Sequence, residues 1–371
     1  MTNRIPLSVP DLRGREAEYL ARCVRENWVS SAGPEVTAME AGIASLTDRR
    51  FAVATVNGTA ALHLALLAVG VRPGDRVIVP DWTFAATANA VAHCGAIPVF
   101  VDVREEDWAL DPELLSEALK IFGGVGAVIA VDPLGHAADL DAIESICRTN
   151  GVAMIEDAAG AIGALYRKRP CGSGGVVSTF SFNGNKTITA GGGGMVVTDD
   201  EDIAEKVRHL STQARLGSDY LHDAVGFNYR MTNLNAALGL AQLERLDEMV
   251  AARQAISERY DKAFRSAPGL ARMPRPKHST GTGWLYSLQF ESEQKAVKLV
   301  DWLNEDGIDA RVFWRSLSVQ KPWSGCSSML RGVSAALSGT VVSLPSSSSL
   351  DASEQAKVIN SVKRFLAKGD L

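Results

Sequence analysis

The amino-acid sequence predicts an α/β fold: a mostly parallel mixed sheet between layers of helices, followed by a smaller C-terminal α/β unit. Two observations support this prediction. Between residues 50 and 200, short apolar runs alternate with segments of helical length. The runs are continuously apolar rather than alternating with polar residues, which is typical of strands buried on both faces of a parallel sheet. The expected strands are 51–56, 76–80, 97–103, 126–132, 152–157, 177–182 and 194–199.

Helices are expected between most of these strands, for example in TAALHLALLAVG and TFAATANAVAHCG. A long helix is expected to begin near Thr232, because apolar residues recur after it at spacings of three and four and form one stripe. The residues of that stripe are Leu240, Leu243, Leu246 and Val250. Segment 272–283 is rich in Pro, Gly, Ser and Thr, which predicts a loop or linker.

The C-terminal unit is expected to contain two strands, WLYSLQFE and DARVFW, around the helix EQKAVKLVDWLNEDG. A last helix is expected from about Ser353, where Asp351 and Glu354 have the spacing of a capping box. We therefore expect two domains: a large one over residues 1–245, including the N-terminal segment, and a small one over residues 246–371.

Composition limits the class of protein. The chain has 371 residues, of which 46% are hydrophobic and 22% charged, and its net charge is −5 at pH 7. This acidic balance, without basic clusters, argues against binding to nucleic acid or to a membrane surface. No strand is followed by G-x-G-x-x-G, which disfavours a dinucleotide-binding domain.

The cysteines and the N-terminus predict a location. The five cysteines are scattered and lack C-x-x-C spacing, so we expect neither a metal site nor disulfides, and a reducing compartment. The N-terminus MTNRIPLSVPDLRG has no apolar segment of the kind that signal peptides carry, and no stretch approaches 18 uninterrupted apolar residues. A cytoplasmic protein is expected.

Two strand ends offer an anion site and an aromatic face. In VNGTAALHLAL, a helix is expected to begin near Thr59, and its free N–H groups together with the Thr59 hydroxyl would suit an anion. A plain turn with Thr59 as N-cap explains this pattern equally well. In PDWTFAATANAV, Trp82 and Phe84 follow a strand and could stack on a planar ligand, although core packing is the commoner role of such aromatic residues.

Two further strand ends offer a carboxylate and an amine. Glu156 and Asp157 end the run VAMIED, and a carboxylate buried there needs a partner such as a protonated ring nitrogen, a salt bridge or a helix N-terminus. In STFSFNGNKTITAGGGG, Lys186 stands four residues past the end of a strand, near the hydroxyl of Ser181. Glycines 191–194 permit close approach of the chain to a ligand. The ordinary alternative is a solvated lysine in a loose loop.

Parallel α/β sheets bind ligands at the carboxyl ends of their strands. These four features are therefore expected to lie together. An anion site, an aromatic ring, a carboxylate and a lysine amine are the groups required by the phosphate, ring, pyridine nitrogen and aldehyde of pyridoxal 5′-phosphate (PLP). The sequence therefore predicts a PLP site.

Long motifs, in the same order, resemble the fold-type-I PLP-dependent aminotransferases of the DegT/StrS sugar-nucleotide group. They cover nearly the whole chain and include NGTAALHLAL, VIVPDWTFAATANAV, IEDAAGAIGALYRKR, TFSFNGNKTITAGGGGMVVT and GFNYRMTNLNAALGLAQLERLDE. The resemblance implies that Lys186 forms the Schiff base with PLP and that Asp157 holds the pyridine nitrogen. It implies further that Phe84 stacks on the ring and that Gly58, Thr59 and Ser181 bind the phosphate, with Ala60 beside them in the cofactor site.

The resemblance also implies a homodimer with shared active sites. Asn228, in GFNYRM, resembles an asparagine that reaches the phosphate from the neighbouring subunit, and Arg230 would lie at the same interface. The implied reaction takes an amino group from L-glutamate and gives it to a 4-keto-6-deoxy sugar nucleotide, for polysaccharide biosynthesis. Lys186 would take the Cα proton of the donor and return it at C4′ of the cofactor, as general base and then as general acid.

The chain departs from the family pattern at three strand ends. Gly192 stands where the family has an acid, Gly160 where it often has Gln, His or Glu, and Asp132 in DPLG where a histidine is common. We therefore expect that the acceptor, or the way it binds, differs from the usual one. A cyclic ketone without a nucleotide, such as a cyclitol, and a non-catalytic PLP-fold binding or regulatory protein remain as alternatives. Sugar dehydratases of the same group carry histidine in place of the lysine, so Lys186 argues against them.

Three other residues have side chains that could belong to the site. His63 lies within an apolar helix and His136 in the loop after DPLG, and both are interpreted as structural. Trp314, in ARVFWRS, could approach the acceptor site from the small domain, and core packing explains it equally well.

Overall fold

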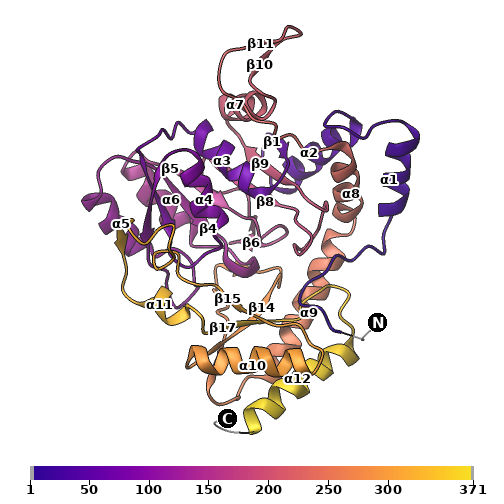
Figure 1. The fold of residues 1–371 in the computed structure, drawn as a ribbon, viewed down its shortest axis with the longest axis vertical. Helices are drawn as coiled ribbons and strands as arrows, with labels where there is room; N and C mark the ends of the chain where they lie inside the picture. The colour runs from indigo at the N-terminus through magenta and orange to yellow at the C-terminus, as the bar shows by residue number, and fades with distance from the viewer. Residues whose placement is uncertain (1–3, 369–371) are drawn as a thin grey trace.

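The computed structural model describes residues 4–368 (Figure 1). Its larger part is built on an eight-stranded sheet with the strand order β1-β9-β8-β5-β4-β2-β3-β16. The strands are β1 (Phe51–Thr55), β2 (Arg76–Pro80), β3 (Ile97–Val101), β4 (Val125–Val131), β5 (Ala153–Asp157), β8 (Val177–Ser181), β9 (Gly194–Thr198) and β16 (Ser328–Met329). The pairs from β8 through β5, β4, β2 and β3 to β16 are parallel, whereas β9 is antiparallel to both β1 and β8. The predicted mostly parallel mixed sheet is thus confirmed.

Helices cover both faces of this sheet. Along β2, Val77 and Val79 pack into one hydrophobic core, whereas Ile78 between them packs into the core on the opposite face. This alternation explains why the strands are apolar at every position: successive side chains of a strand point to opposite faces. The helices of this part are α1 (Glu16–Arg25), α2 (Pro34–Leu46), α3 (Gly58–Ala68), α4 (Ala86–His93), α5 (Pro112–Ile121), α6 (Leu140–Thr149), α7 (Glu201–Ser211) and α8 (Asn233–Leu243).

The C-terminal part forms a second, antiparallel sheet with the order β12-β14-β17-β15 (Figure 1). Its elements are β12 (Leu270–Arg272), β14 (Tyr286–Phe290), β15 (Arg311–Phe313), β17 (Val341–Leu344), α9 (Leu246–Ala263), α10 (Glu293–Glu305), α11 (Val333–Leu337) and α12 (Ala352–Ala367). The expected capping box at Asp351 is present and begins α12. A third hydrophobic core lies here, and Ile5 joins it through a bridge to Ile308.

The prediction of one long helix after Thr232 is wrong. Thr232 caps α8, which ends at Leu243, and a separate helix, α9, begins at Leu246. The apolar spacing continues across the break because Leu240, Leu243, Leu246 and Val250 all contribute to the same core. Periodicity alone could not reveal the interruption. The proposed domain boundary at residue 245 falls at this break.

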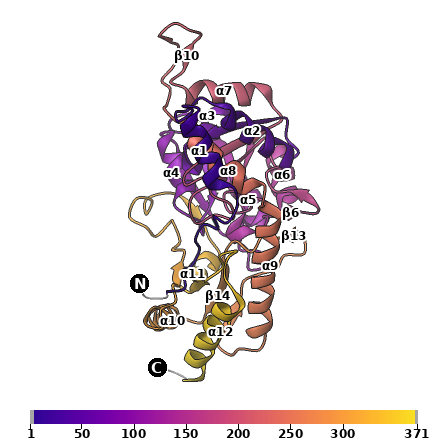
Figure 2. The ribbon, with the colours of Figure 1, turned by 90° about the vertical axis from the view of Figure 1, so that its right-hand side faces the viewer.

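Segment 272–283 is not wholly irregular, because it contains β13 (Ser279–Thr280), which pairs with β6 (Leu165–Tyr166). Strand β6 also pairs with β7 (Arg169–Pro170). Strands β10 (Arg215–Leu216) and β11 (Leu221–His222) form a hairpin that projects away from the body in both ribbon views (Figures 1 and 2). None of the helices within residues 4–368 combines the length and apolar character that crossing a bilayer requires.

Candidate functional site

A cavity of about 330 Å³ opens at the carboxyl ends of β4, β5 and β8. Its walls come from strand ends of the large sheet, from the start of α3 and from β15 and its flanks in the C-terminal part. The structure brings six of the predicted site residues together in this wall: Gly58, Thr59, Phe84, Asp157, Ser181 and Lys186. All three positions that depart from the family pattern line it as well. A volume of this size is in the range of small-molecule sites.

The first turn of α3 forms one end of the cavity. Asn57 is the N-cap, because its side chain accepts a hydrogen bond from the backbone N–H of Ala60 at 2.8 Å. The alternative in which Thr59 is the N-cap of this helix is therefore wrong. Thr59 lies inside the first turn and lines the cavity, and Ala60 does not line it.

Gly58 and Ser181 meet at this end of the cavity. A Cβ atom on Gly58 would lie 2.8 Å from Cβ of Ser181, so only glycine permits this approach of helix and strand. The helix N-terminus carries partial positive charge, and the hydroxyl of Ser181 is a hydrogen-bond donor. This end of the cavity therefore fits a phosphate group.

Asp157 ends β5 and is buried, with 4% of its surface exposed. Its Oδ2 accepts a hydrogen bond from Thr87 Oγ1 at 2.9 Å, and its Oδ1 accepts one from the N–H of Ala159 at 3.2 Å. Burial raises the pKa of Asp157 above its usual 3.8, while the bond from Thr87 and the charge of Lys186 oppose that rise. A cationic ring nitrogen placed beside Asp157 would supply the partner that such a carboxylate needs.

Lys186 lies in the loop after β8, and its amine lines the cavity. Within residues 4–368 its Nζ has no hydrogen-bond partner, but it lies 3.8 Å from the centre of the Trp284 ring. Burial lowers the pKa of Lys186 from 10.5 to about 8, against the opposing charge of Asp157. An amine with this pKa can both accept and release a proton near neutral pH. Lys186 therefore lies in the cavity against the Trp284 ring, which favours the site interpretation over a solvated lysine in a loose loop.

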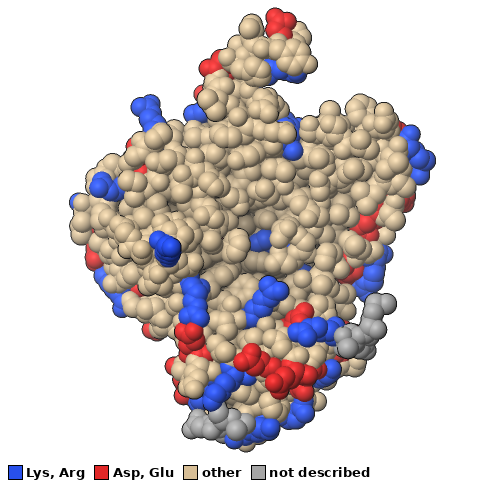
Figure 3. Space-filling view, in the orientation of Figure 1, with Lys and Arg blue, Asp and Glu red and all other residues tan. Residues whose placement is uncertain are grey.

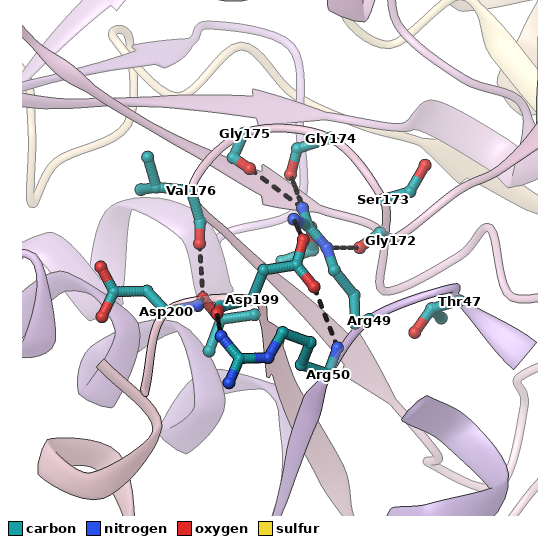
Figure 4. Close-up of polar contacts among 12 residues, drawn as sticks. Thr47, Arg49, Arg50, Gly172, Ser173, Gly174, Gly175, Val176, Asp199 and Asp200 are labelled. Carbon is teal, nitrogen blue, oxygen red and sulfur yellow. Dashed lines mark hydrogen bonds and ion pairs between the residues drawn. The ribbon is translucent and has the colours of Figure 1, made fainter. Parts of the chain in front are cut away.

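Glu156, the neighbour of Asp157, points to the other side of the sheet. Its carboxylate accepts hydrogen bonds from the N–H groups of Gly172 and Gly174, both at 2.7 Å, and from Ser178 Oγ at 3.0 Å. Arg49 fixes the loop that supplies these N–H groups: its guanidinium donates to the carbonyls of residues 172, 174 and 175 (Figure 4). The same guanidinium pairs with Asp199 at 2.8 Å (Figure 4). Glu156 is thus structural.

Asp132 lies between the cavity and Glu156. One of its oxygens accepts from the N–H of Ala138 at 2.9 Å, and the other has no partner within the described residues. Ligand atoms of Asp132, Glu156 and Cys171 lie within 4.8 Å of one another. Burial and the nearby Glu156 raise the pKa of Asp132 well above 3.8. The protonated form of Asp132 is therefore favoured beside the buried Glu156.

The two aromatic residues at the end of β2 have different environments. Trp82 is buried and packs against Trp108 and Trp314, with ring centres 5.4 Å and 5.1 Å apart, so it is a core residue. Phe84 is 60% exposed at the edge of the cavity, where it can cover a flat ligand. Trp314 lines the cavity from the C-terminal part, as one of the two interpretations of the sequence expected.

The wall also contains residues that the sequence did not indicate, among them Thr87, Trp284, Arg311 and Phe313. Thr87 follows Phe84 by three residues, and that helical spacing could have placed both on one side of a turn. Trp284 is the first residue of the expected strand WLYSLQFE, and nothing in that strand's sequence indicated its contact with Lys186. Arg311 and Phe313 alternate along β15, which is the signal of side chains on one face of a strand.

His63, Asn228 and His136 lie outside the cavity wall. His63 is buried against Phe227, with ring centres 4.8 Å apart, and burial lowers its pKa to about 4. His136 is buried with Nε2 2.7 Å from the carbonyl of Asp107. Both are structural, as expected. Asn228 is exposed and pairs with Thr212 in an isolated bridge, while Arg230 forms an ion pair with Glu40 at 3.1 Å.

Comparison with known proteins gives matches along nearly the whole chain. The model of the DegT/DnrJ/EryC1/StrS aminotransferase family matches residues 10–363. A GDP-perosamine synthase from Caulobacter vibrioides is 38% identical over 376 residues, covering 98% of each chain. The solved structure of DesV from S. venezuelae, in complex with a ketimine intermediate, has a TM-score of 0.91 at 30% identity and covers 100% of both chains. Spr1654 from Streptococcus pneumoniae, solved in a PLP-form, has a TM-score of 0.92 at 26% identity, covering 98% of this chain and 99% of that one.

Proposed function

Because the chain belongs to the DegT/DnrJ/EryC1/StrS aminotransferase family, we propose that it is a PLP-dependent aminotransferase that moves an amino group from L-glutamate to a keto sugar nucleotide. The family was expected from the sequence motifs and is confirmed by these matches. The motifs SFNGNK and GFNYRMTNLNAALGLAQLERLDE most resemble GDP-perosamine synthase, and relatives of that name are 37–40% identical.

One observation carries the cofactor proposal: an amine of lowered pKa and a buried carboxylate of raised pKa share one cavity with a helix N-terminus. Lys186 would hold the aldehyde carbon, Asp157 the pyridine nitrogen, and Gly58, Thr59 and Ser181 the phosphate. PLP, when bound, stores the amino group between substrates and accepts the electrons left when a Cα proton is removed. Phe84 would cover its ring.

The residues of the chain account for the proton transfers. The amine of Lys186, with a pKa of about 8, would take the Cα proton of the bound amino acid and later give it back. Asp157 would keep the ring nitrogen protonated, because a carboxylate favours the positively charged form of a nitrogen beside it. Thr87 holds that carboxylate in place through its hydrogen bond.

The exposed surface supports a homodimer with shared sites. The β10–β11 hairpin and the segment after it carry exposed apolar side chains: Tyr220 and Leu221 in the hairpin are 85% and 62% exposed, and Val225 after it is 85% exposed. On the face seen in Figure 3, charged side chains gather over the C-terminal part near α10 and α12, whereas few lie over the large part. Asn228 follows the hairpin and is outside its own chain's cavity, which suits a contact with the cofactor of a partner subunit.

The acceptor side of the cavity suits a ring-shaped, anionic substrate. Among the described residues that line the cavity, Arg311 is the only cation besides Lys186, and Phe313 and Trp314 flank it. A diphosphate would pair with the guanidinium of Arg311, and a sugar or base could stack on the aromatic rings. The shared family supports a nucleotide-linked sugar, while Asp132, Gly160 and Gly192 support an acceptor bound differently from the usual one.

The five cysteines are free thiols, four of them buried, which supports a cytoplasmic enzyme. The function is tested by supplying purified enzyme and PLP with L-glutamate and a panel of acceptors. The panel contains GDP-4-keto-6-deoxymannose, another nucleotide-linked keto sugar, and a cyclitol ketone. Formation of 2-oxoglutarate with a nucleotide-linked acceptor supports the proposal. Turnover of the cyclitol ketone alone would favour the non-nucleotide acceptor, and no turnover with any of the acceptors would favour a binding protein.

A further inference from the structure

The indole of Trp284 is fixed directly against Lys186. Trp284 is 5% exposed, and its ring centre lies 3.8 Å from the lysine Nζ. Its ring N–H donates to the carbonyl of Asn185, the residue before Lys186, at 2.7 Å. The ring is therefore tied to the same turn of chain that carries the lysine.

Arg253 strengthens this link through the backbone. It is 1% exposed, and its guanidinium donates to the carbonyl of Trp284 at 2.9 Å and to that of Lys186 at 3.5 Å. The backbone N–H of Trp284 donates to Thr282 Oγ1 at 3.2 Å. Ring and backbone are thus held at several points, so the indole has little freedom to leave the amine.

Gly160 explains how the indole fits. A Cβ atom at residue 160 would lie 2.5 Å from Cε3 and 2.7 Å from Cζ3 of Trp284, so any side chain there would displace the ring. The backbone of Gly160 has no left-handed φ, so the glycine is required by space and not by conformation. The departure from the family pattern at residue 160 therefore goes together with the position of Trp284.

We propose that Trp284 is a positioning residue for Lys186: its ring face holds the free ammonium group in the cavity whenever the lysine is not bonded to the cofactor. This inference rests on the proposed function. The Nζ of Lys186 has no hydrogen-bond partner among residues 4–368. The two attractive contacts left to it are the face of the Trp284 ring and the charge of Asp157. A cation over an indole face is attracted by the electron density of the ring, most strongly where water is excluded.

The contact can be observed without any reaction. Lysines of the full-length, cofactor-free protein are dimethylated with ¹³C-formaldehyde, which keeps their positive charge. The signal of Lys186 is identified by its absence in Lys186→Arg. We expect it upfield of the other dimethyllysine signals, because the methyl groups lie over an aromatic ring. The upfield shift should be lost in Trp284→Leu and reduced in Gly160→Ala, where the indole is retained but displaced. Trp314→Leu, which removes an indole from the same cavity, should keep it.

The kinetic consequence is measured on the PLP-loaded enzyme by the rate at which L-glutamate bleaches the visible band. Trp284→Leu should lower the saturating rate by about tenfold or more, with little change in the glutamate concentration needed for half-saturation. Trp284→Phe, which keeps a ring face, should recover most of the loss. If wild type did not react with glutamate, the proposed function would fail while the NMR shift still tested the contact.

An unshifted Lys186 signal in wild type would overturn the inference, as would an upfield shift that persists in Trp284→Leu. If Trp284→Leu does not fold, Gly160→Ala and Trp284→Phe decide the question by the same shift. A fall in rate for Trp284→Leu that Phe does not recover would likewise contradict a role for the ring face.

Discussion

Replacing Lys186 with methionine should stabilise the cofactor-free protein. Methionine keeps the length of the lysine stem and removes the charge that burial disfavours. The pKa of Lys186 is lowered from 10.5 to about 8. Since one pKa unit corresponds to about 1.4 kcal/mol, this difference sets a ceiling of about 3.5 kcal/mol on the cost of the ammonium. Water in the open cavity screens part of that cost, so we expect about 1–2 kcal/mol of stabilisation at pH 7.

The pH dependence identifies the cause. Between pH 8 and pH 10.5 the unfolded chain holds the Lys186 proton and the folded chain does not, so wild type gains stability as pH rises through that window. The advantage of Lys186→Met should therefore shrink between pH 7 and pH 9.5. Urea unfolding of both proteins without PLP, at one fixed protomer concentration, measures it. Lys120→Met, on the exposed side of α5, is the control and should change stability by less than about 0.5 kcal/mol at either pH.

A destabilised Lys186→Met protein at pH 7 would refute this reasoning. So would an advantage that is the same at pH 7 and pH 9.5, because it would then come from packing and not from the buried charge.

Three further changes test other parts of the structure. Asp132→Asn should gain about 1 kcal/mol of stability on wild type between pH 4 and pH 8, because a carboxyl whose folded pKa is raised stabilises below its unfolded pKa of 3.8 and loses that contribution as pH rises. Urea midpoints at the two pH values measure this, and equal differences at both would contradict the raised pKa of Asp132. Asp351→Ala removes the capping box of α12 and should cost about 1 kcal/mol, seen as a lower urea midpoint; an unchanged midpoint would mean that the cap contributes nothing. Gly192→Ala should fold normally, because the nearest atom to the new methyl group would be the Val56 carbonyl oxygen at 3.9 Å, and it should raise the KM of the acceptor because residue 192 lines the cavity. A loss of stability in this variant would show that the space beside residue 192 is not open.

The central sheet could be predicted from the sequence because burial on both faces leaves a continuous apolar run. Each predicted strand lies within about two residues of the observed one at either end. The direction of β9 could not be predicted, since an antiparallel strand in the middle of a buried sheet has the same apolar composition as a parallel one. The break between α8 and α9 was missed for a related reason: the apolar stripe faces one core on both sides of it.

Most of the candidate site could be predicted, because its functional side chains lie at strand ends, where the sequence is polar or rich in glycine. Lys186, Asp157 and Ser181 come together only through the parallel order of β5 and β8. Trp284 could not be predicted in this way, because it lies next to a strand of the other sheet, more than ninety residues after Lys186 in the chain. The need for glycine at residue 160 could not be predicted either, because it is the side chain of Trp284 that leaves no room for another residue there.

The most direct test of the account is the absorbance spectrum of the purified protein with PLP, recorded before and after L-glutamate. The account predicts a visible band that borohydride removes, that never forms in Lys186→Ala and that glutamate bleaches. A band that glutamate leaves unchanged would mean that PLP binds but that the donor or the reaction is another one. The absence of any band would contradict the assignment of Lys186 and, with it, the proposed function.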